Sequence, residues 1–330
     1  MKKFLLVVHR FAPHPGGSEA IMGWVAAELV ARGHTVTVST SEEKGRVWYP
    51  LGEDGPCVSV FGRNLYCNPN GYDVTLVHGR SVPHQDKYIL EMDFSRTRLL
   101  FYPYLAVDQS VTPVARLGME KATVVGCLNR ADMILSEAAG GDKRALLPWG
   151  IPDYLSEYKV PGKPYFAILG GFWPHKRIRE FVNMYCEHGP KDIDLICLGY
   201  HGQPDFASGG NVTTMINPSY EVTQNVIANA ACVFQNGNRE GFGLTILEAM
   251  RAGVTWRSVD TGSAIDIAHQ IGLPKRLIWD DPGNVLKLWK DVPAQVVLNG
   301  LAKEAELMRP AFLENYTIQK CVDRILGAVL

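Results

Sequence analysis

The chain has 330 residues, of which 46% are hydrophobic, 20% charged and 10% aromatic; this is the composition of a folded globular protein and excludes a disordered or collagen-like one. The 33 lysines and arginines are balanced by 34 aspartates and glutamates, and this net charge of -1 disfavours a dedicated duplex-DNA binder. At roughly 150 residues per domain, the length predicts about two domains.

The first forty residues have the pattern of a strand, a loop, a helix and a second strand. An apolar run at 4–8 is followed by a loop that contains several prolines and glycines. The next stretch has a start signal at Ser18, apolar side chains at helical spacing and a stop at Gly33. Residues 35–38 are apolar or β-branched, as expected for a parallel strand that is covered on both faces.

The same alternation continues to about residue 150. Further strands are expected at 74–77, 99–102 and 133–135, with a helical pattern at 114–128. Around Pro148 the periodic pattern stops, and a polar stretch to Pro164 indicates a connection between domains. Residues 1–150 are therefore predicted to form one α/β domain.

A second α/β series follows this connection. Its predicted strands are residues 165–169, 195–198, 212–216 and 232–234, and its predicted helices are residues 178–187, 220–230 and 244–252. After Asp281 the pattern is helical, and it ends in an amphipathic helix at 316–329. Because doubly wound domains bind ligands at the carboxyl ends of their strands, two such domains that face each other would leave a binding cleft between them.

No transmembrane, secreted or metal-dependent class is indicated. No stretch approaches 18 consecutive apolar residues, and the run at 4–8 is too short for a signal peptide, so a cytoplasmic protein is expected. The seven cysteines are scattered without a Cys-x-x-Cys pair, which indicates reduced core side chains. The histidines show no ligand spacing with cysteines or acids, so no metal site is expected.

The most informative stretch is 238–253, which follows a predicted strand and opens a predicted helix. Gly241 and Gly243 let the backbone turn tightly and approach a ligand closely. The N–H groups of residues 242–245 form the positive end of the helix dipole. This combination favours an anion site of a size suited to a diphosphate.

Two carboxylates flank that anion site. Glu240 precedes the predicted helix, and Glu248 lies about one turn inside it. Because a carboxylate beside a phosphate would repel it, both are expected to accept hydrogen bonds from neutral hydroxyls, such as those of a ribose and a sugar. The alternative is an acid-glycine turn that begins an ordinary helix, with Glu248 in solvent.

This arrangement resembles the signature of the retaining family 4 glycosyltransferases of the GT-B fold, in which two glutamates with seven residues between them surround a Gly-Phe-Gly-Leu turn. The resemblance spans most of the chain through further matching segments at 14–19, 32–38, 73–78, 147–151, 169–171 with Lys176, and 261–263. It implies two doubly wound, Rossmann-like α/β domains that face a cleft. The acceptor-side domain would be 1–150, the nucleotide-sugar-binding domain 151–312, and a terminal helix at 313–330 would return to the first domain.

The resemblance also implies roles for individual residues. Glu240 would hold a hydroxyl of the donor sugar and Lys176 would neutralise the leaving diphosphate, so these two are the expected catalytic residues. The implied donor-binding residues are Gly16, Gly17, Gly171, Lys176, Arg177, Glu240, Gly241, Phe242, Gly243, Leu244, Thr245 and Glu248, with the last on the ribose. His78, Tyr102 and Tyr104 are expected to contact the acceptor or the sugar. No cofactor is implied, since the nucleotide sugar is itself the co-substrate.

The sequence departs from the family pattern at three places. Near Gly262, Ser263 and Asp266 stand where the family has its second glycine and a glutamate. Gly171 stands where relatives usually carry an arginine, and Arg177 is the nearby cation that could replace it. Relatives often have a histidine at the end of the strand that here covers 99–102, and Tyr102 or Tyr104 is the candidate replacement.

The sequence thus predicts a metal-independent, retaining transfer of a sugar from a nucleotide diphosphate sugar to an acceptor hydroxyl. A UDP sugar is the favoured donor and a GDP sugar the second choice. Three alternatives stay open: a nucleotide-sugar 2-epimerase, a degenerate non-catalytic partner subunit of the same fold, and a transferase that acts on modified nucleic acid. The near-neutral net charge disfavours the last of these.

Overall fold

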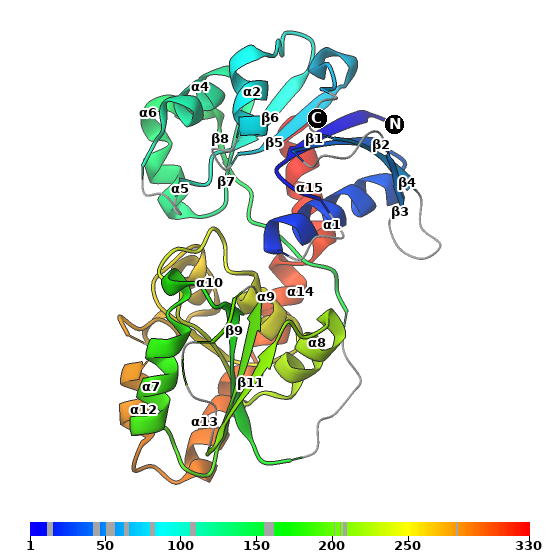
Figure 1. Ribbon diagram of the computed structural model, residues 1–330. Helices are drawn as coiled ribbons and strands as arrows, with labels where there is room; N and C mark the ends of the chain where they lie inside the picture. Colours follow the sequence, from blue (N-terminus) through cyan, green and yellow to red (C-terminus); the bar gives the residue numbers. More distant parts are fainter. Residues whose placement is uncertain are drawn as a thin grey trace. The chain divides into compact units, whose positions relative to one another are not determined.

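The computed structural model describes residues 1–11, 16–41, 47–50, 57–62, 66–79, 83–105, 110–154, 162–200, 202–204, 206, 210–281 and 283–330. The chain divides into two compact units (Figure 1). Unit 1 contains Met1–Pro152 and Thr317–Leu330, and unit 2 contains Asp153–Tyr316. Among the described helices, none combines the length and the apolar character that a membrane span needs.

Unit 1 is built on a sheet whose described strands have the order β3-β4-β2-β1-β5-β6-β7-β8. The strands are β1 (Lys3–Val8), β2 (Thr35–Thr40), β3 (Val47–Pro50), β4 (Cys57–Phe61), β5 (Val74–His78), β6 (Arg98–Tyr102), β7 (Val124–Cys127) and β8 (Arg144–Leu146). All neighbouring pairs are parallel except β3 and β4. The order reverses between β1 and β5, so the unit is doubly wound.

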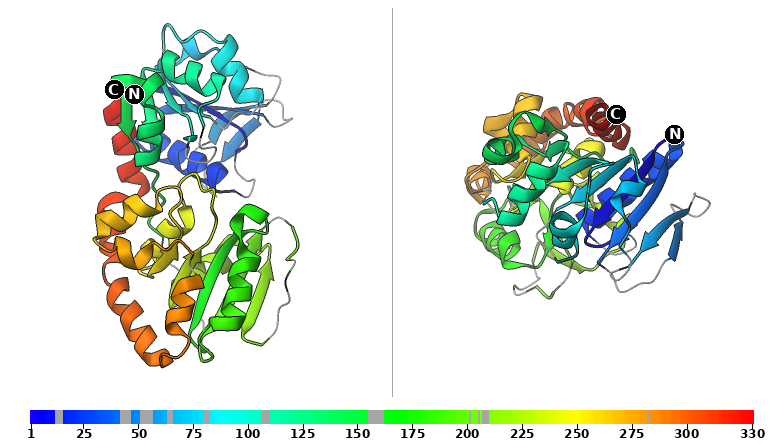
Figure 2. Two further views of the ribbon diagram at one scale, coloured as in Figure 1. Left: turned by 90° about the vertical axis from the view of Figure 1, so that its left-hand side faces the viewer. Right: turned by 90° about the horizontal axis from the view of Figure 1, so that it is seen from above.

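The helices of unit 1 include one from the end of the chain. They are α1 (Gly17–Ala31), α2 (Pro83–Glu91), α4 (Pro113–Lys121), α5 (Arg130–Leu135), α6 (Glu137–Gly140) and α15 (Ile318–Val329), with short 3-10 turns η1 (Pro69–Gly71) and η2 (Gly141–Lys143). The terminal helix α15 packs beside α1 (Figure 2). The Ile318 N–H donates to the Ile151 carbonyl at 2.9 Å, and Arg32 pairs with Asp323 at 2.6 Å.

Two of the sequence predictions for unit 1 are wrong. Residues 133–135 lie at the end of helix α5 and not in a strand. The reason is local: the Asn129 side chain accepts a hydrogen bond from the Asp132 N–H at 2.8 Å, and the Asp132 carboxylate accepts from the Leu128 N–H at 3.1 Å, so the first turn of a helix is capped. The helical pattern predicted at 114–128 ends at Lys121, and residues 124–127, which begin with two β-branched valines, form strand β7.

Unit 2 is built on a parallel sheet whose described strands have the order β11-β10-β9-β12-β13. The strands are β9 (Tyr165–Gly171), β10 (Asp194–Tyr200), β11 (Val212–Ile216), β12 (Cys232–Gln235) and β13 (Trp256–Ser258). The helices are α7 (Ile178–His188), α8 (Tyr220–Asn229), α9 (Leu244–Arg251), α10 (Ala264–Ile271), α11 (Pro274–Leu277), α12 (Gly283–Trp289), α13 (Ala294–Ala305) and α14 (Met308–Asn315), and η3 (Pro174–Lys176) is a 3-10 turn. The strands and helices predicted between residues 165 and 252 are confirmed, whereas β13 was not predicted.

Helices cover both faces of the unit 2 sheet, as Figure 1 shows, with α7 and α12 on one side and α8 and α9 on the other. Phe166, Ile168 and Phe234 point to the first side and form one buried core with Phe181 and Leu286 of the covering helices. Because alternate residues of a strand point to opposite faces, both faces of a strand between two helix layers must be apolar. This explains the nearly continuous apolar runs in the sequence.

A buried ion pair ties the edge of this sheet to α13. Arg257 of β13 donates to Glu304 at 2.8 Å, and the two side chains are 4% and 7% exposed. The Thr255 hydroxyl donates to the same carboxylate oxygen at 3.1 Å. Strand β13 leads directly into the loop that contacts the candidate site described below.

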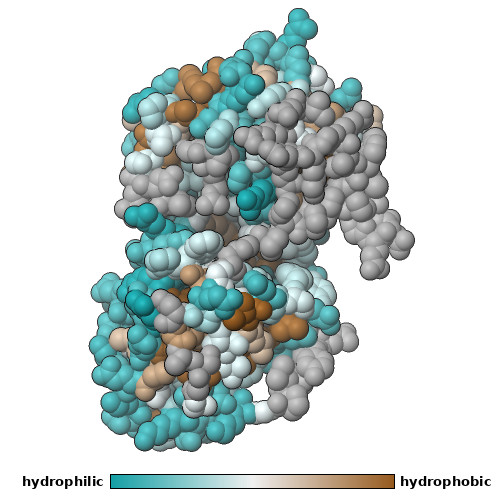
Figure 3. Space-filling model, in the orientation of Figure 1, coloured by the Kyte–Doolittle hydropathy of each residue, from teal (hydrophilic) through white to brown (hydrophobic). Residues whose placement is uncertain are grey.

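The described surface is mainly hydrophilic in the view of Figure 3. One of the cysteines predicted to be in the core, Cys186 of α7, is exposed, because it lies on the outer face of that helix. The prediction is wrong for this residue. The side chain of Cys57 lies outside the described residues, and the other cysteines are free and buried.

Candidate functional site

The candidate site lies at the carboxyl edge of the unit 2 sheet. Strand β9 is followed by β10 on one side, whereas β12 lies on its other side, so the strand order reverses between β9 and β12. In open α/β sheets this switch point is where ligands bind. Lys176 lies in the loop after β9, and Glu240 lies in the loop after β12. The topology therefore brings the two predicted catalytic residues to the same switch point.

Lys176 and Glu240 form a close ion pair. The Lys176 Nζ donates to both carboxylate oxygens of Glu240, at 2.7 and 2.8 Å. The side chains are 22% and 14% exposed, so the pair is largely shielded but still open to solvent. A cation and a hydrogen-bond acceptor are thus held within one contact of each other at the edge of the sheet.

Two further hydrogen bonds fix the loops that carry this pair. The Asn238 N–H donates to the carbonyl of His175 at 3.0 Å. The Asn236 Nδ2 donates to the carbonyl of Arg177 at 2.9 Å, and Asn236 is 3% exposed. Because these bonds flank Lys176 and precede Glu240, they set the distance between the two loops.

A third loop, which follows β13, supports the Glu240 segment from its other side. The Glu240 N–H donates to the Thr261 hydroxyl at 3.1 Å, and the Ser263 N–H donates to the Phe242 carbonyl at 3.0 Å. Gly262 has a left-handed φ of +56°. A Cβ at this position would lie 3.0 Å from the Phe242 carbonyl oxygen and 3.1 Å from that of Glu240. Only glycine can adopt this left-handed φ and also fit this close to the two carbonyl oxygens without strain.

Replacing Gly262 by alanine should destabilise unit 2 by about 2 kcal/mol and lower ligand affinity, because left-handed strain adds to contact with the Glu240 segment. Gly272→Ala is the matched control, since Gly272 also has a left-handed φ of +81° but no atom of the described residues lies within 4 Å of its Cβ position. Calorimetric unfolding of both variants tests this. Equal losses of stability would show that the close approach at Gly262 carries no cost.

Helix α9 begins next to Glu240. Gly243, its N-cap, has φ of 100° and ψ of 59°, and no side chain of the described residues caps the helix. The first N–H groups of a helix have no intrahelical partner, so Leu244 and Thr245 present donors at the positive end of the dipole. Phe242 itself is 4% exposed, so its ring packs inward. The predicted anion-binding turn has the expected local geometry, and its ligand stays a prediction.

Glu248 lies one turn further along α9, partly buried. Its Oε1 accepts a hydrogen bond from Gln224 Nε2 of α8 at 2.9 Å. Burial raises the pKa of the Glu248 carboxyl, while the nearby Arg251 and the Gln224 hydrogen bond oppose that rise. Glu248 therefore belongs to a polar cluster between α8 and α9, separate in its contacts from the Lys176–Glu240 pair.

Trp173 occupies the place where a side chain at position 171 would lie. A Cβ on Gly171 would be 2.4 Å from the Trp173 ring, which is itself half exposed. Arg177, the predicted replacement cation, has a left-handed φ of 49° and lines a cavity of about 110 Å³ together with Trp173 and Phe206. An indole ring thus fills the space beside Gly171.

In unit 1, the predicted glycines lie at the start of α1. Gly16 is the N-cap of the helix and Gly17 its first residue. A Cβ on Gly16 would lie 2.2 Å from the Glu19 Oε2, so the Glu19 carboxylate folds over this position. The preceding His14 and Pro15, which belong to the same motif, lie outside the described residues.

The predicted acceptor contacts form a buried aromatic cluster at the ends of β5 and β6. His78 is 1% exposed and hydrogen-bonds through Nε2 to the Tyr104 hydroxyl. The Trp149 Nε1 donates to the same hydroxyl at 3.0 Å. Tyr102 is fully buried against Trp149, and burial raises its pKa well above the usual range. The structure brings His78 and Tyr104 together, and their contact with an acceptor stays a prediction.

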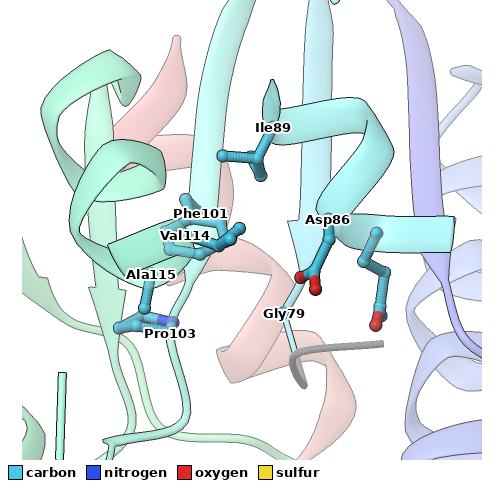
Figure 4. Close-up of a pocket in the computed structure, with 8 residues that line it drawn as sticks. Gly79, Asp86, Ile89, Phe101, Pro103, Val114 and Ala115 are labelled. Carbon is cyan, nitrogen blue, oxygen red and sulfur yellow. The ribbon is translucent and has the colours of Figure 1, made fainter. Parts of the chain in front are cut away.

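A small cavity lies beside this cluster. Figure 4 shows Asp86 of α2 next to Gly79, which follows β5, with Phe101 and Pro103 further along the wall. The cavity has a volume of about 10 Å³, which is room for one water molecule. Burial raises the pKa of the Asp86 carboxyl. This cavity is too small for a sugar.

Several residues of the site were not predicted from the sequence. They are Asn236, Thr261, Gln224 and Arg251. Asn236 carried a signal, because it directly follows a buried strand at its carboxyl end. Thr261 and Arg251 lie in the segments 261–263 and 238–253 that the sequence pattern had already marked, but without a role of their own. Gln224 acts through a contact between segments that are distant in sequence.

The chain matches no protein-family model and no curated protein sequence. Solved structures do match it over its whole length. HepE of Anabaena in complex with UDP and glucose has a TM-score of 0.73 at 14% sequence identity. The match covers 100% of this chain and 99% of the HepE chain. Sucrose-phosphate synthase of Thermosynechococcus elongatus has a TM-score of 0.75 at 14% identity, covering 99% of this chain and 98% of that one. A trehalose-6-phosphate protein of E. coli bound with UDP-2-fluoro glucose has a TM-score of 0.68 at 10% sequence identity. The match covers 99% of this chain and 98% of that one.

At such low identity these similarities establish the fold alone. The chain has the GT-B fold, with two doubly wound parallel-sheet α/β domains, as the sequence predicted.

Proposed function

We propose that this chain is a retaining, metal-independent glycosyltransferase that moves a sugar from a nucleotide diphosphate sugar to an acceptor hydroxyl in the cytoplasm. The observation that carries the proposal is the Lys176–Glu240 pair at the β9/β12 switch point, beside the start of α9, where no side chain in the described part of the chain caps the helix. A cation and a helix N-terminus stabilise the negative charge of a departing diphosphate, and a carboxylate accepts a hydrogen bond from a sugar hydroxyl. The proteins of the same fold that are complexed with UDP-glucose or with UDP and glucose support this choice.

In the proposed reaction, the bond between the anomeric carbon and the diphosphate oxygen breaks, and its electron pair leaves with the diphosphate. Lys176 turns from Glu240 to the diphosphate and compensates the developing charge. The acceptor oxygen bonds to the anomeric carbon on the same face, and its proton passes to the departing phosphate oxygen. No protein nucleophile takes part, so catalysis rests on positioning and charge.

The donor base is a separate question. A UDP sugar is the first donor to test and a GDP sugar the second. An ADP sugar belongs in the same test, because starch synthase IV of Arabidopsis, a protein of the same fold, is bound to ADP and acarbose.

The test is a panel of UDP, GDP and ADP sugars, with release of nucleoside diphosphate as the readout. We expect slow hydrolysis of one class of donor, release of the sugar with its original anomeric configuration by NMR, and a loss of about 10²-fold or more for Glu240→Gln. The binding of UDP, GDP and ADP is measured in parallel by calorimetric titration. The absence of both binding and hydrolysis across the panel would favour a non-catalytic partner subunit.

Other outcomes of the same assay identify the remaining alternatives. An epimerised nucleotide sugar formed without any acceptor would indicate a 2-epimerase. Strong, salt-dependent retention on immobilised DNA would point to a nucleic-acid acceptor, because such binding releases counterions.

A further inference from the structure

Glu248 is connected to a buried arginine through one glutamine. Gln224 of α8 donates from Nε2 to the Glu248 carboxylate at 2.9 Å, and its Oε1 accepts a hydrogen bond from the Arg251 guanidinium. Gln224 is 3% exposed and Arg251 is 2% exposed. A polar chain of three side chains thus runs between α8 and α9, and its outer end is the partly buried carboxylate.

The direction of these hydrogen bonds fixes the glutamine amide. Arginine has only donors, so the amide oxygen of Gln224 must face Arg251. The amide NH₂ must then face Glu248. If the Gln224 amide were flipped, its NH₂ group would face the N–H donors of Arg251 and its oxygen would face the carboxylate oxygens of Glu248. Both hydrogen bonds would then be lost.

Arg251 is itself held in place from several sides. Its Nη1 lies 3.5 Å from the Tyr220 hydroxyl, and its guanidinium lies 5.7 Å from the centre of the Tyr154 ring. Arg309 donates to the Arg251 carbonyl at 3.0 Å, which fixes the end of α9. A fixed arginine therefore fixes the glutamine, and the glutamine fixes the carboxylate.

Gln224 also separates two opposite charges. Glu248 and Arg251 are three residues apart on α9, a spacing at which side chains of a helix can meet. With Gln224 between them, one oxygen of Glu248 is held by the amide and the carboxylate is kept from turning onto the guanidinium. The remaining lone pairs can then accept hydrogen bonds from a ligand.

We propose that Gln224, oriented by Arg251, is a positioning residue that holds Glu248 ready for the hydroxyls of a ribose, so that the site selects ribonucleotides over 2′-deoxyribonucleotides. The proposal rests on the proposed function and on the expectation, implied by the sequence resemblance, that Glu248 contacts the ribose of the donor. A carboxylate that is already oriented loses little freedom on binding, and a ligand that lacks the 2′-hydroxyl leaves an acceptor without its partner.

The test measures the dissociation constants of UDP and 2′-deoxy-UDP by calorimetry. For the unmodified chain we expect 2′-deoxy-UDP to bind about 10- to 100-fold more weakly, the range for a hydrogen bond to a charged group. Gln224→Met, which keeps length but removes both polar atoms, should reduce this ratio severalfold toward one. Gln295→Met, at an exposed glutamine of α13, is the control and should leave the ratio unchanged.

A double variant shows whether Gln224 acts through Glu248. In a Glu248→Gln background the ratio should already be small, and adding Gln224→Met should not change it further. A purely structural role would instead weaken UDP and 2′-deoxy-UDP equally in both backgrounds. Gln224→Glu is the second variant, since it keeps the contact with Arg251 and thereby the packing, but places a carboxylate against Glu248.

The outcomes separate the two proposals. If the unmodified chain binds none of UDP, GDP and ADP, the proposed function fails. If it binds UDP and the ratio is one, or if the folded Gln224 variants keep the full ratio, only the role of Gln224 is overturned. If GDP or ADP binds in place of UDP, the same comparison is made with that nucleotide and its 2′-deoxy form.

Discussion

Replacing Lys176 by methionine should lower the turnover of the donor by about 10²- to 10³-fold, which is the effect of removing one group that stabilises transition-state charge, about 2.7–4 kcal/mol. The ammonium lies 2.7 Å from Glu240 at the switch point of unit 2 and is 22% exposed, so it is partly shielded from solvent but accessible to a ligand. Because the charge on the diphosphate develops as the bond breaks, kcat should fall more than the donor KM rises.

Controls must separate catalysis from folding. Lys176→Met leaves the Glu240 carboxylate, which is 14% exposed, without its cation, and this could lower stability. The double variant Lys176→Met with Glu240→Gln removes both charges and should restore the unfolding midpoint without restoring turnover. Lys191→Met, at an exposed lysine of the same unit, should behave as the unmodified chain. A folded Lys176→Met with normal kcat would remove this residue from the reaction.

Glu304→Ala should destabilise unit 2 by about 3–5 kcal/mol, because it leaves the Arg257 guanidinium buried without a counter-charge. Arg257 is 4% exposed, and Glu304 also accepts from Thr255 and, at 3.4 Å, from Arg276. For a unit of this size the unfolding midpoint should fall by roughly 10 °C. Scanning calorimetry measures it, with attention to the transition of unit 2.

The matched control for this pair is Arg276→Ala. Arg276 contacts the same carboxylate, but its side chain is 65% exposed, so its removal should cost no more than about 1 kcal/mol. Replacing both buried partners, Arg257→Met with Glu304→Leu, should recover most of the loss, since apolar side chains need no counter-charge. Equal effects of Glu304→Ala and Arg276→Ala would contradict the buried-charge argument.

Loss of the Arg257–Glu304 ion pair should also affect the candidate site. Strand β13 carries Arg257 and leads into the loop where Thr261 and Gly262 contact the Glu240 segment. We therefore expect Glu304→Ala to weaken nucleotide binding even at temperatures where unit 2 stays folded.

The strands and helices of unit 2 could be predicted because their signals are local. The apolar run of β9, the helical spacing in α7 and the glycine before α9 are each visible within about ten residues of sequence. Short elements were harder: the three residues of β13 include an arginine and a serine, and these polar side chains are buried with Glu304 and Gln235 among their hydrogen-bond partners. The segment 133–135 failed for a related reason, since three apolar residues do not distinguish a strand from the end of a capped helix.

The sequence alone predicted which side chains would bind a diphosphate and a sugar, and it determined that Lys176 and Glu240 follow strands of a doubly wound sheet. These are properties of residue type and of local periodicity. Tertiary structure decided which of the adjacent Lys176 and Arg177 pairs with Glu240, and that Glu248 is held by Gln224 and Arg251. Such contacts join segments 24 to 64 residues apart, and they depend on how strands cross over in space, a relation that no local pattern of residues contains.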